Sequence, residues 1–459
     1  MAEKHVHFIG VGGMGMSGLA LIMVERGYLV SGSDLRSTEL TGKLEEKGVR
    51  IYRGHKKENI EGADIVVYSA AVPQDNEEIK AAQQAGLPLL HRADVLAEII
   101  NDAVGVAVAG AHGKTTTTSM LGLAMERCGL DPTVLVGAFS DDLAGNARLG
   151  QGRYVVAEAC ESDYSFLKYR PFATIITNVE ADHLENYQGD FNLLIDAYRQ
   201  FLDKVKPGGF SVLCTDDLLL REMKEQVGHT SYSYGFNPDA DYQPTNIKYF
   251  ASGSRYDFCF RGRHLASVAL SVPGEHNVLN SLSVLAVGHQ LDIELEPLAR
   301  ALKDFHGVRR RFQHIGTHND IMVVDDYAHH PTEIAVTLKA AKLQAKKRVV
   351  TFFQPKRYTR TQFLFDEFTN SFADTDVLVM SDIFPFGEEP IPGITAEILA
   401  RAIEKERGIE VILVPYKHNV IVDKLMEILQ PGDLAMIMGA GDDIAELAQK
   451  VFVAVREGN

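Results

Sequence analysis

The sequence contains few cysteines for its length, four among 459 residues. Cys128, Cys160, Cys214 and Cys259 are widely spaced and form no Cys-x-x-Cys pair. This spacing indicates neither a zinc site nor a disulfide framework. We therefore expect a protein of a reducing compartment, the cytoplasm.

Net positive charge and long apolar runs are also missing. The net charge is −16, which argues against a nucleic-acid partner because phosphate neutralisation needs a basic surface. Anionic substrates must then be held by local groups. There is no run of about 18 apolar residues and no apolar signal region near the start. We expect a soluble protein without membrane insertion, and its length predicts about three domains.

A phosphate-binding loop is the most informative feature that is present. Residues 109–118 read Ala-Gly-Ala-His-Gly-Lys-Thr-Thr-Thr-Thr and follow the apolar run Val104–Val108. Gly110 and Gly113 allow backbone amides to converge on an anion, Lys114 can reach the β- and γ-phosphates, and Thr115 can bind Mg²⁺ at a helix start. The pattern predicts ATP as ligand; the plainer alternative is a Gly/Thr-rich turn with a chance lysine.

A second glycine turn stands near the start of the chain. Strand 5–9 is followed by Gly10–Gly15, a G-x-G-x-x-G turn, then by a helix predicted over 16–26 and a strand over 28–32. With Asp34 just beyond, the motif alone indicates NAD. The downstream nucleotide site instead favours another diphosphate-bearing ligand. Further strands (65–69, 87–90) and helices (75–85, 93–101) continue the alternation, which implies a parallel sheet.

The second predicted domain carries acidic groups at strand ends. Strand 154–157 is followed by Glu158, and strand 173–177 by Asn178, Asp182 and His183. Ligands of open parallel sheets bind at that edge, and Mg²⁺ prefers oxygen donors, so Glu158 is the first-choice ligand. Glu161 and Asp163 are competing acids, with helix capping as their structural alternative. Residues 232–270 suggest an antiparallel patch, and 273–280 open a helix.

The third predicted domain follows the basic segment Val308–Phe312. Its expected strands lie near 321–325, 349–353, 377–380, 411–414 and 434–438. Two polar clusters follow the first two strands, Asp325–Pro331 and Gln354–Arg360. Their arginines suit a carboxylate or a transferring phosphoryl group. The adjacent histidines could bind metal, but the proline more simply marks a helix start.

Taken together, these motifs resemble the Mur ligase superfamily, most closely its alanine-adding branch. The resemblance covers nearly the whole chain and rests on His7–Met16, Gly113–Thr117, Glu158–Asp163, Thr177–His183, Arg310–Phe312, Asp325–Glu333 and Phe353–Thr361. Ala111 stands where the family usually has threonine and Cys160 where it usually has aspartate. Neither departure removes an essential group.

The resemblance implies an α/β protein of three domains: an N-terminal Rossmann-like domain (1–102) for UDP-N-acetylmuramate, a central P-loop ATPase-like domain with an antiparallel patch (103–307) for ATP, and a C-terminal Rossmann-like domain (308–459) for L-alanine. The implied ATP-binding residues are Gly110, Ala111, His112, Gly113, Lys114, Thr115, Thr116, His276, Asn277, Asn280, Arg310 and Asp325. The implied UDP-sugar residues are Gly12, Gly13, Met14, Asp34, Ser69 and Arg92. The implied Mg²⁺ ligands are Thr115, Glu158 and His183, and the implied catalytic set is Lys114, His183, His329, Arg357 and Arg360, of which the last three would hold the amino acid.

The implied reaction joins alanine to the lactyl carboxylate of the UDP-sugar through an acyl phosphate, in peptidoglycan precursor synthesis. Many superfamily members hold a second Mg²⁺ through a carbamylated lysine about fifteen residues beyond the histidine that corresponds to His183. Here Tyr198 stands at that position, as expected for the alanine-adding branch, since tyrosine cannot form a carbamate. Two alternatives stay open: a related ligase that attaches a tripeptide to the same sugar, and a non-catalytic nucleotide sensor.

Overall fold

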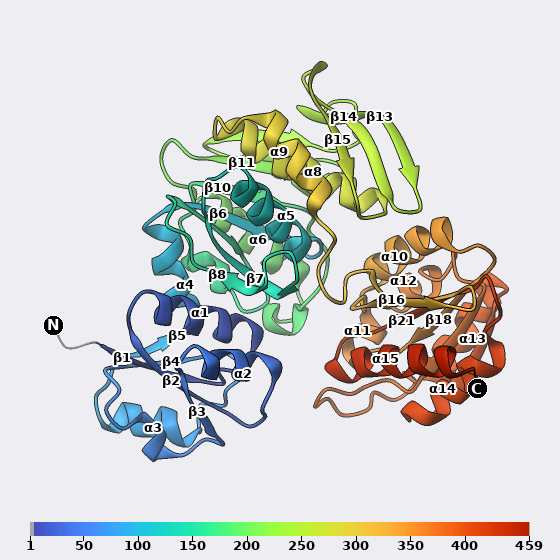
Figure 1. Ribbon diagram of the computed structural model, residues 1–459, viewed down its shortest axis with the longest axis horizontal. Coiled ribbons are helices and arrows are strands. Elements are labelled where there is room, and N and C mark those ends of the chain that lie inside the picture. The colour runs from blue at the N-terminus through green and yellow to red at the C-terminus, as the bar shows by residue number, and fades with distance from the viewer. Residues whose placement is uncertain (1–3, 459) are drawn as a thin grey trace. The chain divides into compact units, whose positions relative to one another are not determined.

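The computed structural model describes residues 4–458 and contains three β-sheets with helices around them (Figure 1). The chain divides into two compact units. The first runs up to Ile247 and includes Arg255–Leu270 and Val278–His306; the second comprises Lys248–Ser254, Ser271–Asn277 and the chain from Gly307 onward. The predicted domain boundaries at 102/103 and 307/308 stay predictions. None of the helices within residues 4–458 is long and apolar enough to cross a membrane.

The N-terminal sheet has five parallel strands in the order β3-β2-β1-β4-β5. This confirms the Rossmann-like prediction. The strands are β1 (His5–Ile9), β2 (Leu29–Asp34), β3 (Arg50–Arg53), β4 (Ile65–Tyr68) and β5 (Leu89–His91), and the helices are α1 (Met14–Glu25), α2 (Glu39–Glu46), η1 (Lys57–Ile60), α3 (Glu77–Gln84) and α4 (Arg92–Asn101).

Two details of this domain differ from the sequence-based expectation. Helix α1 begins two residues early, directly after Gly13, so Gly15 lies inside the helix and not in the turn. The pair α2 and β3 was not predicted, because both are short and β3 has no fully buried residue to create a pattern.

The middle sheet has ten strands in the order β15-β14-β13-β12-β11-β10-β6-β9-β7-β8. Its first half contains β6 (Val104–Ala109), α5 (Lys114–Arg127), β7 (Thr133–Ser140), β8 (Gly145–Arg148), β9 (Tyr154–Glu158), η2 (Ser165–Lys168), β10 (Ala173–Ile176), η3 (Leu184–Tyr187) and α6 (Phe191–Leu202). Its second half contains β11 (Phe210–Cys214), α7 (Leu218–Lys224), β12 (Thr230–Tyr234), β13 (Tyr242–Phe250), β14 (Gly253–Phe260), β15 (Arg263–Leu270), α8 (Glu275–Gln290), α9 (Leu295–Ala301) and η4 (Leu302–Asp304).

The antiparallel patch is smaller than predicted. Strand β12 pairs parallel with both β11 and β13, so its aromatic residues belong to the parallel part of the sheet. Strands β13, β14 and β15 are sheet neighbours joined by two-residue connections, which only antiparallel hairpins allow. The patch therefore begins at Tyr242 and not at Tyr232.

The C-terminal sheet has six strands in the order β16-β17-β21-β18-β19-β20, with β16 antiparallel at the edge. Its elements are β16 (Gln313–His318), β17 (Ile321–Asp326), α10 (Pro331–Gln344), β18 (Val349–Phe353), α11 (Tyr358–Phe363), α12 (Phe365–Asn370), β19 (Val377–Ser381), α13 (Ala396–Arg407), β20 (Glu410–Val414), α14 (His418–Ile428), β21 (Leu434–Met438) and α15 (Asp442–Glu457).

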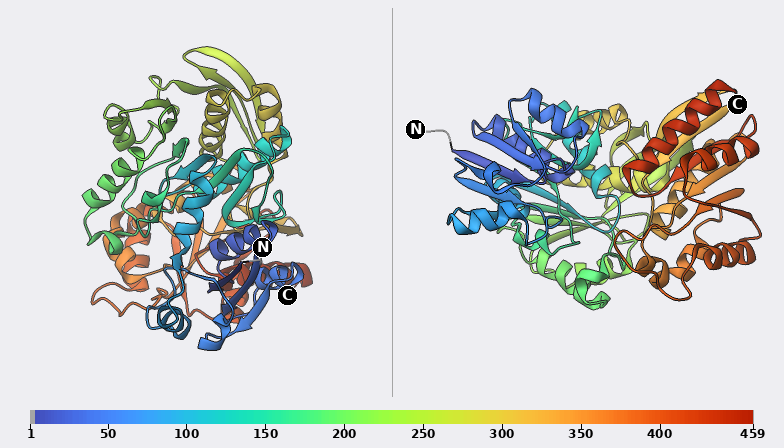
Figure 2. Two further views of the ribbon diagram at one scale, coloured as in Figure 1. Left: turned by 90° about the vertical axis from the view of Figure 1, so that its left-hand side faces the viewer. Right: turned by 90° about the horizontal axis from the view of Figure 1, so that it is seen from below.

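Alternate residues along the strands of this sheet point to opposite faces, and each face packs into its own hydrophobic core. Phe353 and its same-face neighbours pack with α10, α12 and α13. Phe352 and the opposite face pack with α14 and α15, and Figure 2 shows α15, in red, covering that side. Because both faces are buried, the strands read as continuous apolar runs, and the ranges 349–353 and 434–438 were predicted without error.

A buried polar cluster braces the N-terminal sheet. The Glu78 side chain is fully buried; its carboxylate accepts hydrogen bonds from Ser33 Oγ and Asn59 Nδ2, both at 2.5 Å, and lies 3.7 Å from His7 Nε2. Burial raises the pKa of Glu78, but the neighbouring His7, Ser33 and Asn59 outweigh burial and hold this pKa below its ordinary value. The cluster therefore ties α3 to β1 and β2 through an ionised carboxylate.

We predict that Glu78→Gln destabilises this domain by about 1–3 kcal/mol at pH 7, because charge-assisted hydrogen bonds are lost. The pKa of Glu78 is lower in the folded protein than the ordinary value of 4.5. The stability that its carboxylate contributes is therefore present above pH 4.5 and is lost as the pH falls through the folded pKa. The difference between the variant and the wild type should thus shrink in acid. Since the chain has no tryptophan, the measurement is hydrogen exchange of β1 and β2.

The matched control is Glu77→Gln, which changes the exposed neighbour in the first turn of the same helix. It should leave exchange of β1 and β2 almost unchanged. Equal protection loss in both variants, or a pH-independent loss in Glu78→Gln, would contradict the bracing role.

Candidate active site

The loop between β6 and α5 has the geometry of a phosphate-binding loop. Gly110 has φ +131° and Gly113 has φ +82°, conformations that favour glycine. A Cβ on Gly110 would lie 2.0 Å from Thr177 Oγ1, and one on Gly113 would lie 2.8 Å from Asn280 Oδ1. The glycines therefore permit both the backbone shape and the close approach of two neighbouring segments.

Lys114, the first residue of α5, is held by an acid. Its Nζ donates to the Glu161 carboxylate oxygens, both at 3.0 Å, and to the carbonyl oxygens of Gly110 and Ala111. Burial lowers the pKa of Lys114, but the Glu161 charge outweighs it and raises this pKa. Lys114 is therefore charged, and Glu161 is the acid paired with it.

The strands on either side of β6 bring the predicted metal ligands to the loop. In the order β10-β6-β9 all three strands run parallel, and Glu158, the last residue of β9, pairs in register with Val108. The Glu158 carboxylate accepts the Gly137 N–H. His183 follows β10 with φ +55°, and its ring lies 3.7 Å from Asp182 and 3.6 Å from Glu185. Glu158 and His183 thus follow the two strands that neighbour β6, and Thr115 is the second residue of α5, which follows the loop after β6.

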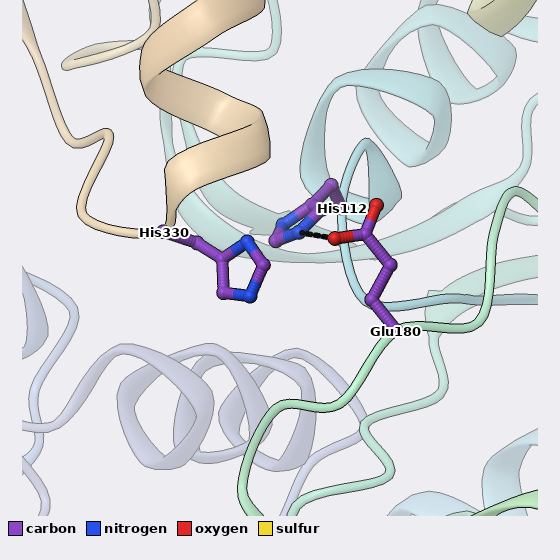
Figure 3. A group of neighbouring side chains, drawn as sticks. All are labelled: His112, Glu180 and His330. Atoms are coloured by element: carbon purple, nitrogen blue, oxygen red, sulfur yellow. Dashed lines mark hydrogen bonds and ion pairs between the residues drawn. The ribbon is translucent and has the colours of Figure 1, made fainter. Parts of the chain in front are cut away.

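The residues after β10 also cradle the loop backbone. The N–H of Ala111 donates to Asn178 O at 3.2 Å, and the N–H of His112 donates to Asn178 Oδ1 at 2.8 Å. Figure 3 shows the His112 ring facing Glu180, with 3.3 Å between Nε2 and the carboxylate. His330, also drawn there, belongs to the second unit.

Tyr198 on α6 is buried, and the charges of Glu161 and Asp182 act on it. Burial, followed by the charge of Glu161, raises the pKa of Tyr198 well above its ordinary value, so the phenol stays neutral. Its hydroxyl has no hydrogen-bond partner among the described residues. The two lysines further on do not approach it: Lys206 donates to the carbonyls of Asn101 and Ala103, and Lys204 is exposed beyond the helix end.

The predicted UDP-sugar residues gather at the carboxyl edge of the N-terminal sheet. Asp34 Oδ2 accepts the Gly12 N–H at 2.9 Å, so the acid closes the glycine turn itself. A Cβ on Gly15 would lie 3.1 Å from Arg92 Nη1. Ser69 follows β4, and its hydroxyl would lie 3.7 Å from a Cβ on Gly10.

The glycine turn is tied to the middle sheet. Asn146 Nδ2 donates to Met14 O at 2.5 Å and to Ser17 Oγ at 2.9 Å. Helix α1 packs on β7 and β8, with Gly18 so close to Ala147 that a Cβ would lie 3.0 Å from the alanine methyl. The first unit therefore joins the predicted sugar and phosphate sites through α1.

The second unit collects its predicted residues at the end of β17. Arg310 Nε lies 3.3 Å from Asp325 Oδ2, its Nη2 donates to Gly439 O at 2.7 Å, and its guanidinium lies 4.8 Å from the Tyr327 ring centre. Burial raises the pKa of Asp326 to about 7. The Arg311 charge and the N–H groups of Phe312 and Ala328 lower this pKa, but burial outweighs them.

The paired histidines have structural partners. His330 caps α10 and Pro331 is its first residue, which agrees with the proline interpretation. The ring of His329 lies 3.0 Å from Tyr327 O and 3.2 Å from Glu333 Oε2. Among the described residues, the only group of three or more His, Cys, Asp or Glu side chains with metal-ligand spacing is His112, Glu180 and His330. These residues come from different units, so no metal site is assigned to the histidine pair.

The remaining predicted residues of the second unit lie on the loop after β18 and on α8. Arg357 has φ +74°, and Arg360 in α11 is almost fully buried. Burial, and then the Arg311 charge, lowers the pKa of His276 to about 4, so its ring is neutral at pH 7. The ATP set is thus divided: Asn280 and the loop belong to the first unit, and His276, Asn277, Arg310 and Asp325 to the second. Their common role stays a prediction.

Sequence reasoning missed several residues of the site. Glu161 was considered as a metal ligand or a cap, and its pairing with Lys114 was not expected. The contacts of Thr177, Gly137 and Asn146 were not expected either. Glu161 and Thr177 stand at or just beyond the ends of strands next to β6, and that position was the available signal; for Asn146 the sequence offers none.

Comparisons with known proteins agree with this architecture. Three family models match in order: "Mur ligase family, catalytic domain" at residues 5–103, "Mur ligase middle domain" at 108–288, and "Mur ligase, glutamate ligase domain" at 310–441. The chain belongs to the Mur ligase family and is an ATP-dependent, amide-bond-forming ligase.

The curated relatives that this chain resembles are named for one particular ligase activity. A UDP-N-acetylmuramate–L-alanine ligase of Pelotomaculum thermopropionicum is 48% identical over 441 residues, which cover 96% of this chain and 95% of the relative. One of Symbiobacterium thermophilum is 47% identical over 450 residues, covering 96% and 93%. The crystal structure of a UDP-N-acetylmuramate-alanine ligase from Thermotoga maritima matches with a TM-score of 0.83 and 28% identity, over 100% of both chains. A murein peptide ligase from Psychrobacter arcticus matches with a TM-score of 0.72 and 25% identity, over 99% of both.

We predict that Gly113→Ala weakens ATP binding by at least about tenfold. A left-handed φ costs an alanine about 1–2 kcal/mol, and the new methyl must also displace Asn280, which would lie 2.8 Å away. The control is Gly129→Ala at the other end of α5, where φ is +74° and no atom lies within 4 Å. Calorimetry should find near wild-type ATP affinity in the control. If both variants lose affinity equally, the close approach of Asn280 does not matter.

Proposed function

We propose that the protein joins L-alanine to the lactyl carboxylate of UDP-N-acetylmuramate at the expense of ATP, in peptidoglycan precursor synthesis. The observation that supports this most is the loop of Gly110–Lys114, with Glu158 at the end of β9 on one side and Asn178 after β10 on the other, in a chain whose relatives at 47–48% identity carry that ligase name. A cytoplasmic location, expected from the cysteine spacing, is part of the same proposal.

The residues of the chain would act mainly by binding and positioning. The loop amides and Lys114 would hold the ATP phosphates while the sugar carboxylate attacks the γ-phosphorus, which forms the acyl phosphate, breaks the bond to the β–γ bridging oxygen and releases ADP. The alanine amine then displaces phosphate. Lys114 would exchange its bond to Glu161 for the phosphate oxygens, which keeps the buried ammonium paired throughout.

The donors beside the loop fit Mg²⁺. Thr115 and Glu158 offer the oxygen ligands that this ion prefers, and His183 stands on the other side of the loop. When bound, Mg²⁺ would neutralise charge on the transferring phosphoryl group. Glu158 would then release or share the Gly137 N–H, which its carboxylate accepts here.

The substrate groups would be divided among the sheet edges. Gly12, Gly13, Met14, Asp34, Ser69 and Arg92 would bind the UDP-sugar. His276, Asn277 and Asn280 would lie near adenine, with Arg310 and Asp325 toward the nucleotide phosphates and ribose. The amino acid would be held by His329, Arg357 and Arg360, whose guanidinium groups suit its carboxylate.

The experiment is phosphate release from ATP in the presence of UDP-N-acetylmuramate and either L-alanine or the tripeptide. We expect release with alanine. Release with the tripeptide alone would favour the murein peptide ligase activity, and nucleotide binding without release would favour a sensor.

We predict that Lys114→Ala abolishes turnover and leaves UDP-sugar affinity nearly unchanged, because the lysine serves the ATP phosphates while the sugar residues lie on another sheet. Turnover is measured as phosphate release and affinity by calorimetry. The control is Lys204→Ala, which removes an exposed lysine of the same unit. Wild-type turnover in Lys114→Ala, or a loss of sugar affinity, would show that the assigned role is wrong.

We predict that activity does not depend on bicarbonate or CO₂. Tyr198 cannot form a carbamate, Lys206 is bonded to two carbonyl oxygens, and Lys204 lies outside the helix. The test is turnover in CO₂-depleted buffer with and without bicarbonate, together with intact mass at neutral pH. Strong rescue by bicarbonate would mean that another lysine supplies a carbamate.

A further inference from the structure

A segment that the sequence analysis passed over runs along the loop of Arg357. After β19 the chain continues as Phe384–Glu388, here called the arm. Its Phe384 N–H donates to Pro355 O at 2.8 Å, and Phe384 O accepts the Arg357 N–H at 2.9 Å, with Lys356 and Phe384 forming a parallel bridge. The arm therefore extends the pairing of β18 and β19 beyond the sheet edge.

Glu388 of the arm forms hydrogen bonds with the first turn of α11. Glu388 Oε2 accepts the Thr359 N–H at 3.1 Å, and Oε1 accepts the Thr359 hydroxyl at 2.5 Å. Thr359 is the second residue of α11, where the backbone N–H has no partner within the helix, and Arg357 at the cap position makes no side-chain cap bond. Glu388 thus supplies the missing cap from a distant segment.

The arm also presents an aromatic ring to two cations. The Phe386 ring is 55% exposed, and its centre lies 4.3 Å from Lys356 Nζ and 4.9 Å from Arg357 Cζ. Both distances suit a cation–π interaction. Arg357 has φ +74°, which is costly for a residue other than glycine, so its backbone shape must be held by its surroundings. The Phe384 carbonyl and the Phe386 ring hold its two ends.

We propose that the arm positions Arg357 and Arg360 for the amino-acid substrate, with Glu388 fixing α11 and Phe386 fixing the Arg357 guanidinium. Both are positioning residues and contact no substrate themselves. The inference rests on the proposed function, in which these arginines hold the alanine carboxylate. A forked guanidinium binds a carboxylate only in one plane, so a small rotation of α11 weakens alanine binding before it affects the other substrates.

The experiment compares the KM values for L-alanine, ATP and UDP-N-acetylmuramate in Glu388→Gln with those in Glu389→Gln, its exposed neighbour. We expect the alanine KM to rise by about tenfold or more in Glu388→Gln, since small misplacements of a substrate-binding group are costly. The other two KM values and the melting temperature should stay near wild type, and Glu389→Gln should change nothing.

A second pair of variants tests the ring. Phe386→Leu keeps an apolar side chain but removes the π face, and should raise the alanine KM; Phe386→Tyr keeps the face and should restore it. A wild-type alanine KM in Glu388→Gln would overturn the inference. So would an equal rise in all three KM values with a lower melting temperature, which indicates a merely structural role. If the wild-type enzyme shows no alanine-dependent phosphate release, the proposed function itself fails.

Discussion

The parallel pairing of β10, β6 and β9 is the constraint on which the candidate site depends. Parallel neighbours end at the same sheet edge, so the loop after β6 receives Thr177 and Asn178 from one side and Glu158 from the other. The loop glycines leave no room for a side chain because Thr177 lies so close to Gly110, and Asn280 of α8 so close to Gly113. A register shift by one residue would turn Glu158 to the opposite face of the sheet.

Three buried charges in this protein are matched by nearby polar groups. Lys114 has Glu161, Arg310 has Asp325, and the fully buried Glu78 has hydroxyl and amide donors. Since an unpaired buried charge is far costlier than a paired one, each pair fixes two elements relative to each other. In the proposed reaction the ATP phosphates would replace Glu161 as the partner of Lys114, so that the ammonium would stay paired.

In the C-terminal sheet a distant segment, the arm, likewise holds a charged loop in place. The buried strands of this sheet end in short polar loops, and the loop after β18 combines the positive φ of Arg357 with the neighbouring charges of Lys356 and Arg360. The arm from β19 supplies the backbone acceptor, the ring and the carboxylate that hold it. Proteins commonly place such strain at functional sites, where the surrounding structure maintains it.

The fold class, the glycine loops and the strands buried on both faces could be predicted from the amino-acid sequence, because these follow from local patterns: apolar runs of strand length, glycines where φ is positive, and proline at a helix start, as at Pro331. The sequence also predicted roles for Lys114 and Glu158, which follow a glycine loop and a strand, and, through the family resemblance, a role for His183; these roles stay predictions. Three contacts could not be predicted in this way and are visible only in the folded chain: Glu161 pairs with Lys114, Asn146 bonds to Met14, and Glu388 caps the helix of Arg360. These contacts join residues 29 to 132 positions apart, and which distant polar groups meet depends on strand order and packing, which no local pattern encodes.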